Sequence, residues 1–120
     1  MFSWFRKKPK PLQPEGKWVV AIEDDQISVR NESGRLKSVA KSDLSGVAIE
    51  TNDSGPWGAD VWWMLFDATD QMACTFPQGA KGEDAAINWL TALPSFNHGE
   101  MIRAMGSTNN AVFAVWRKEL

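Results

Sequence analysis

The sequence predicts an α+β fold, in which an antiparallel, strongly curled sheet of about six to seven strands packs against one or two C-terminal helices. From residue 17 to residue 76, short segments alternate apolar with polar side chains and are separated by turn residues, which is typical of strands. After residue 83 the apolar period becomes helical. Strands that precede helices in this way indicate α+β rather than a parallel α/β sheet.

Six strands are expected before the helices, in a single meander. In the second, Ile27 and Val29 point inward. In the sixth, Met72, Cys74 and Phe76 share one face. The six segments are 17–23, 26–31, 36–40, 47–51, 61–66 and 71–76.

The fifth segment is the central strand. Val61 to Phe66 is a run of apolar residues with Asp60 and Asp67 at its ends. Both faces are therefore apolar, and we expect both to be covered. A helix could cover one face, and a curled sheet, a long loop or a second subunit the other.

Two helices and a last strand follow. The first helix is predicted over 83–93, and Asn97 with Glu100 forms a capping-box pattern that begins the second. In the second helix, Ile102 and Met105 are expected to face inward, and Gly106 suits the position after the helix. The last strand is expected over 111–116. A curled sheet closed by a helix would resemble a pleckstrin-homology roll, which implies no function.

The chain is expected to form one domain, since 120 residues is close to the usual domain size. Residues 1–17 are a basic, proline-rich tail with five basic residues and one acidic residue, and 18–120 form an acidic globular domain with eight basic and fourteen acidic residues. The formal net charge of −2 argues against nucleic-acid binding. Aromatic and basic residues within 1–10 could give weak membrane contact, and a solubilising end is the alternative.

The candidate binding surface is the loop before the central strand. Its turn-forming residues include Gly55 and Gly58, which flank Trp57, so the indole either covers the core or awaits a ligand. The proposed contact residues are Asn52, Asp53, Ser54, Trp57, Asp60 and Trp62. Aromatic residues that could line a groove with them for a protein partner are Trp57, Trp62, Trp63, Phe66 and Trp89, although packing in the core explains most of these side chains as well.

Two other sites have simpler explanations. Asp53 and Asp60 could bind a hard cation or act as an acid–base pair, but turn and strand-end roles explain them as well. Residues 79–84 could hold an anion at a helix N-terminus, yet Glu83 and Asp84 would repel phosphate, which favours an ordinary helix start.

Several chemistries are disfavoured by composition. Cys74 and His98 are the only residues of their kinds, so we expect no zinc site, no metal, no cofactor and no intrachain disulfide. Cys74 is expected to be a buried, inert thiol, and no catalytic residue is assigned. A lone cysteine, with no secretory signal and no apolar run long enough to span a bilayer, indicates the cytoplasm.

Three segments together resemble a family of small uncharacterised bacterial proteins: Asn52–Trp63 (NDSGPWGADVWW), Phe76–Gly79 and Ala104–Thr108. The resemblance covers about residues 18 to 117 and implies a bacterial cytosolic protein. The hypothesis is a non-enzymatic binding or protein-interaction module, with a protein partner or a second copy as its occupant. The alternatives are a small-ligand-binding protein or enzyme that uses Asp53 and Asp60, and a membrane-peripheral protein tethered by 1–10.

Overall fold

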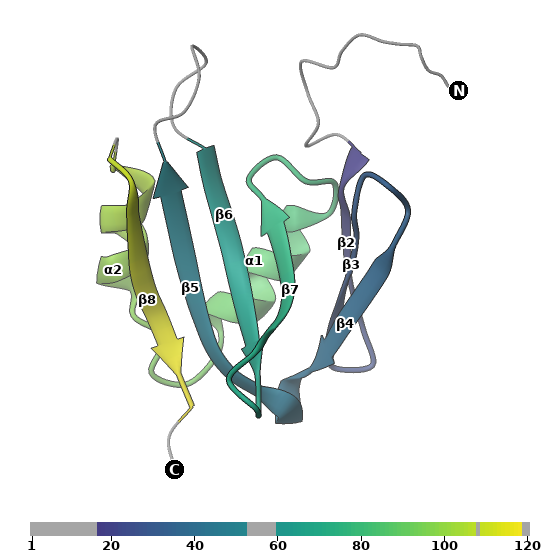
Figure 1. The fold of residues 1–120 in the computed structure, drawn as a ribbon. Helices are drawn as coiled ribbons and strands as arrows, with labels where there is room; N and C mark the ends of the chain where they lie inside the picture. The colour runs from purple at the N-terminus through teal and green to yellow at the C-terminus, as the bar shows by residue number, and fades with distance from the viewer. Residues whose placement is uncertain (1–16, 53–59, 108, 119–120) are drawn as a thin grey trace, which may run out of the picture.

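The computed structural model describes residues 17–52, 60–107 and 109–118 as two antiparallel sheets and two helices (Figure 1). The predicted α+β class is confirmed. The first sheet has the order β2-β3-β4, formed by Val19–Glu23, Gln26–Arg30 and Leu36–Ala40. The second has the order β7-β6-β5-β8, formed by Met72–Pro77, Asp60–Asp67, Leu44–Asn52 and Ala111–Arg117. The helices are α1 (Glu83–Thr91) and α2 (His98–Met105).

The expected single meander is wrong, because the chain changes sheets after β4. A 3-10 turn at Lys41–Asp43 joins β4 to β5, and Lys41 N–H donates to the Asp25 carbonyl (3.0 Å). β5 then starts at Leu44, earlier than predicted, and pairs with β6 instead of β4. Neither sheet closes on itself.

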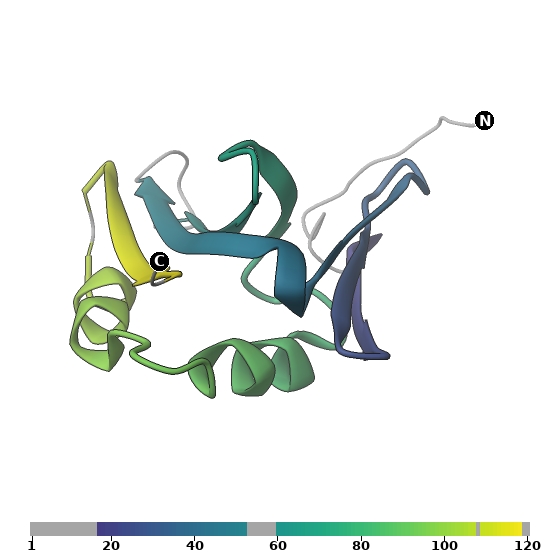
Figure 2. The same ribbon diagram turned by 90° about the horizontal axis from the view of Figure 1, so that it is seen from below.

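The core lies between the four-stranded sheet and the helices. Figure 2 shows α1 and α2 on the same side of that sheet, with β8 at one end and the three-stranded sheet at the other. Along β6, Val61, Trp63 and Leu65 are buried, as expected for the side that the helices cover. The other large side chains of this core are Val47, Ile49, Phe76, Leu90, Leu93 and Val115.

A short segment before α1 connects the two sheets. Lys81 pairs with β2 through its backbone: its carbonyl accepts from Val20 N–H (2.8 Å), and its own N–H donates to the Trp18 carbonyl (2.9 Å). Gly82, which follows, has φ +88°. A Cβ there would lie 2.1 Å from the Val20 carbonyl oxygen, so only glycine fits this crossing.

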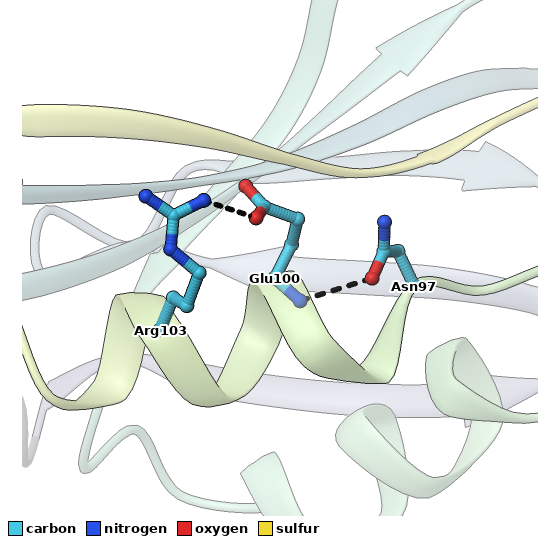
Figure 3. A network of polar contacts seen from close by, with 3 residues as sticks. All are labelled: Asn97, Glu100 and Arg103. Atoms are coloured by element: carbon cyan, nitrogen blue, oxygen red, sulfur yellow. Dashed lines mark hydrogen bonds and ion pairs between the residues drawn. The ribbon is translucent and has the colours of Figure 1, made fainter.

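Helix α2 confirms the predicted start and corrects the predicted inward face. The Asn97 side chain accepts from Glu100 N–H (3.0 Å), while the Glu100 carboxylate turns to Arg103 instead of completing the capping box (Figure 3). Ile102 is 67% exposed and Met105 39% exposed, so their predicted inward orientation is wrong. Ala104 is the buried residue of this helix, since its small side chain allows the helix to approach the sheet.

The end of α2 also differs from the prediction. Gly106 is the C-cap residue itself, with φ −94°, so it does not adopt the left-handed conformation expected of a glycine after the helix. Its N–H donates to the Ile102 carbonyl (3.2 Å), which continues the helical pattern for one more residue.

Strand β7 contains a bulge that reverses one of its side chains. Leu65 of β6 pairs with Cys74, but the next residue, Phe66, pairs with Met72, so Ala73 is an extra residue. Because a bulge shifts the alternation by one residue, Met72 points away from Cys74 and is 51% exposed. The prediction that Met72, Cys74 and Phe76 share one face is therefore wrong for Met72.

Candidate binding face

The side of the four-stranded sheet opposite the helices is apolar. Residues that pair directly across antiparallel strands point to the same side, so the strand register defines this surface. Ala48 pairs with both Met64 and Ala114, and Glu50 pairs with both Trp62 and Val112. The same register also places Gly46, Pro77 and the exposed Arg117 on this side. We use the name outer face for the following residues of this side: Ala48, Glu50, Trp62, Met64, Phe66, Met72, Thr75, Val112 and Ala114.

Much of the outer face is accessible. Val112 is 61% exposed and Met72 51% exposed, and they lie on the two edge strands. Trp62, Met64 and Phe66 of the central β6 are half-buried. Among the described residues no helix covers this side of the sheet (Figure 2), so the second cover expected for the central strand is not supplied by either helix.

One aromatic contact fixes a border of the outer face. The Trp18 ring meets the Trp62 ring edge-on, with centroids 5.4 Å apart and planes at 83°. This T-shaped geometry directs the positive edge of one indole at the π face of the other. The contact holds the Trp62 side chain beside the three-stranded sheet, which we call the small sheet.

The two residues that bound the predicted 52–60 loop, Asn52 and Asp60, lie at one end of the outer face. Asn52 ends β5 and Asp60 begins β6, and the two residues pair across the strands. Trp62, two residues farther along, belongs to the outer face. Asp53, Ser54 and Trp57 lie outside the described residues, as do residues 1–10 with their predicted membrane contact.

The predicted aromatic groove is not assembled as expected. Trp62 and Phe66 lie on the outer face, but Trp63 is fully buried on the opposite side of β6, stacked on Phe76 with centroids 6.2 Å apart. Trp89 lies on α1, where its indole N–H donates to the Asp25 carboxylate (3.2 Å). These two indoles stabilise the core and the helix–sheet contact, and take no part in the outer face.

A pocket of about 80 Å³ adjoins the outer face where the two sheets meet, and we call it the inter-sheet pocket. Three residues join this pocket to the outer face. Met72 and Thr75 line the pocket and belong to the outer face, and Trp18 lines the pocket and contacts Trp62 of the outer face. Its other lining residues are Val29, Asn31, Arg35, Lys37, Ala73 and Cys74.

Two cationic side chains, those of Arg35 and Lys37, line the inter-sheet pocket. Lys37 pairs with the buried Val29, so it lies on the side of the small sheet that carries the core residues. Arg35 follows a turn held by the Asn31 side chain, which accepts from the Arg35 N–H (3.0 Å). Both side chains are exposed, and within the described part of the chain neither has a carboxylate at ion-pair distance.

Burial disfavours the reactive thiolate form of the thiol in the pocket wall. Burial raises the pKa of Cys74 to about 11, and the positive charge of Lys37 opposes this shift only in part. A thiol with such a pKa stays protonated, whereas reactive cysteines need a depressed pKa. The expectation that Cys74 is buried is confirmed, and its inertness stays a prediction.

The candidate anion site at residues 79–84 is an ordinary helix start. Gly79 N–H donates to the Glu83 carboxylate (2.9 Å), so the protein's own side chain satisfies this amide. Residues 17–52, 60–107 and 109–118 contain no cluster of His, Cys, Asp or Glu that could hold a metal ion. In the same ranges, neither helix is long and apolar enough to cross a bilayer.

Sequence reasoning missed several residues of this surface. Lys37 could have been found, because strand alternation places it on the same side as the inward Val39. Met72 could not, since no residue type marks the bulge at Ala73. Trp18 could not be found either, since only the three-dimensional arrangement brings it to Trp62.

Comparisons of the chain with protein-family models, with curated protein sequences and with solved structures found no match. The functional interpretation therefore rests on the geometry of the outer face, and the resemblance to small bacterial proteins stays a prediction.

Proposed function

We propose that this protein is a non-enzymatic protein-interaction module, and that the outer face is its contact surface, together with the 52–60 loop beside it. The observation that supports this proposal is a mainly apolar surface to which all four strands of one sheet contribute. Soluble proteins seldom expose large contiguous apolar patches unless the patch binds something. Val112 and Met72, at its two edges, are its exposed large apolar members.

The composition of the outer face also favours a protein partner. The outer face holds an indole, a phenyl ring and two methionines, and Glu50 is the carboxylate among its members. Aromatic residues and methionine are enriched in protein–protein contacts, and charged residues are depleted at their centres. Methionine adapts its shape to a partner, because its side chain is unbranched and polarisable.

The test is site-specific photo-crosslinking. A photoreactive amino acid replaces Val112 on the outer face, and in a control protein it replaces Ile102, which has a similar exposure of 67% against 61% but lies on α2, on the other side of the sheet. We expect a discrete adduct in cells from position 112 and none from position 102. No adduct at 112, or equal adducts at both, would contradict the proposal.

The identity of the adduct separates two kinds of partner. Mass spectrometry distinguishes a second copy of this chain from another protein, and sedimentation of the purified protein reports the homodimer independently. We also propose a cytoplasmic location, which the single, buried Cys74 supports because it needs no oxidising compartment.

A further inference from the structure

The outer face and the inter-sheet pocket form one surface, since Met72 and Thr75 belong to both. We infer that the partner presents an extended segment in which an apolar side chain lies next to an acidic one. The apolar side chain packs on the outer face near Met72 and Phe66, and the carboxylate pairs with Arg35 and Lys37. This inference rests on the proposed function and adds the chemistry of the partner.

The size of the pocket favours one side chain over a whole small molecule. Its volume is about 80 Å³. Sites that enclose drug-sized ligands usually measure about 300–1,000 Å³. The Trp18 ring and Met72 give the pocket apolar walls, and its cations lie at the side of the small sheet.

The charges favour an acidic partner. The two cations at the pocket have no carboxylate of their own among the described residues, and the nearest edge of the outer face has no charged member. A carboxylate that binds between Arg35 and Lys37 gains two charge-assisted contacts. Complementary charge at the border of an apolar contact sets which partner binds and in which register.

Edge protection is a competing explanation for Lys37 alone. It lies on β4, the edge strand of the small sheet, and inward-pointing charges on edge strands prevent unwanted strand pairing. That role does not require Arg35 and predicts no preference for acidic peptides. The two explanations therefore differ in a measurable way.

The experiment selects short random peptides displayed on phage against the intact protein. We expect the selected peptides to combine an aromatic or aliphatic residue with adjacent Asp or Glu. A labelled peptide of this kind should bind about tenfold more tightly than its Asn/Gln counterpart, and this preference should weaken as salt rises. In the double variant Arg35→Gln, Lys37→Gln the preference should disappear.

The matched control is Arg30→Gln, an exposed arginine at the end of β3 that does not line the pocket. It should leave the preference intact, and circular dichroism checks that each variant is folded. Selection of neutral apolar peptides, no selection at all, or an acidic preference that survives the double variant would each overturn the inference. Neutral peptides together with a crosslink at Val112 would leave the proposed function standing, whereas loss of that crosslink would remove both.

Discussion

Two glycines with the same backbone conformation differ in what surrounds them. Gly82 and Gly34 both have φ +88°, a region that costs most other residues about 1–2 kcal/mol. A Cβ at Gly82 would meet the Val20 carbonyl oxygen, whereas a Cβ at Gly34 would have nothing within 4 Å. Substitutions at these two glycines therefore separate the cost of the positive φ from the cost of steric overlap with β2 at the junction of the two sheets.

We expect Gly82→Ala to destabilise the protein more than Gly34→Ala does, by at least about 2 kcal/mol, because the backbone must move to relieve the overlap. Urea unfolding monitored by tryptophan fluorescence measures both changes. Equal losses of unfolding free energy in the two variants would mean that the backbone contact between Lys81 and β2 adjusts at little energetic cost. Position 82 would then need glycine only for its φ.

Cys74 gives a prediction about alkaline pH. Its pKa is raised to about 11 in the folded protein, from 9.0 for a free thiol, so between these values the folded state holds a proton that the unfolded state has lost. Stability from this group is complete below pH 9 and falls as the pH rises. With rising pH, the denaturant midpoint of unfolding should fall less steeply for Cys74→Ala than for wild type. The same pH dependence in both proteins would contradict the raised pKa of Cys74.

At the scale of elements, helix α2 shows that a local capping signal can be predicted correctly while the buried face of the same helix is predicted wrongly. The Asn97 cap was readable from sequence because it depends on residues three positions apart. The inward face was not, because Ile102 and Ala104 are both compatible with helical spacing, and the sheet selected the smaller residue. Arg103 lies 5.7 Å from the Phe113 ring centroid and links the helix surface to β8.

Asn97→Ala should cost about 1 kcal/mol, since it removes the acceptor for Glu100 N–H at the helix start. Asn97→Ser should restore most of that stability, because a serine hydroxyl caps the same amide. Thermal unfolding followed by circular dichroism makes the comparison. If the serine variant were as unstable as the alanine variant, the loss would come from another contact of Asn97.

The strands were predictable in number and approximate position, because alternation is a local property. Their division into two sheets was not, since it depends on the Lys41–Asp43 turn and on which strand β5 joins. For the candidate site, sequence reasoning selected Trp62, which lies on the outer face, but could not bring Trp18 or the two cations to the same surface. Those contacts join residues far apart in the chain.

At the scale of the whole molecule, stability should be unevenly distributed. β5 and β6 are the central strands of the larger sheet, and their inward side chains are buried. β4 is an edge strand, and Leu36 to Ser38 of it are exposed. Amides in central, buried strands open only in large-scale unfolding, while those at edges open locally.

Hydrogen exchange measured by mass spectrometry should therefore find the slowest exchange in β5 and β6 and distinctly faster exchange in β4. The three-stranded sheet should gain protection when an acidic peptide binds at Arg35 and Lys37, whereas β8 should respond only to occupation of the outer face. Equal protection of β4 and β6 would mean that the two sheets unfold as one cooperative unit.

The pairing of β8 with β5 has a consequence for synthesis of the protein on the ribosome. β5 emerges early, but its neighbour β8 is translated only after β6, β7 and both helices, a delay on the order of seconds. During that interval the nascent chain displays an open strand edge, and Val115 is missing from the core. The growing polypeptide therefore leaves the β5 edge without its partner strand until β8 has been translated and pairs with it.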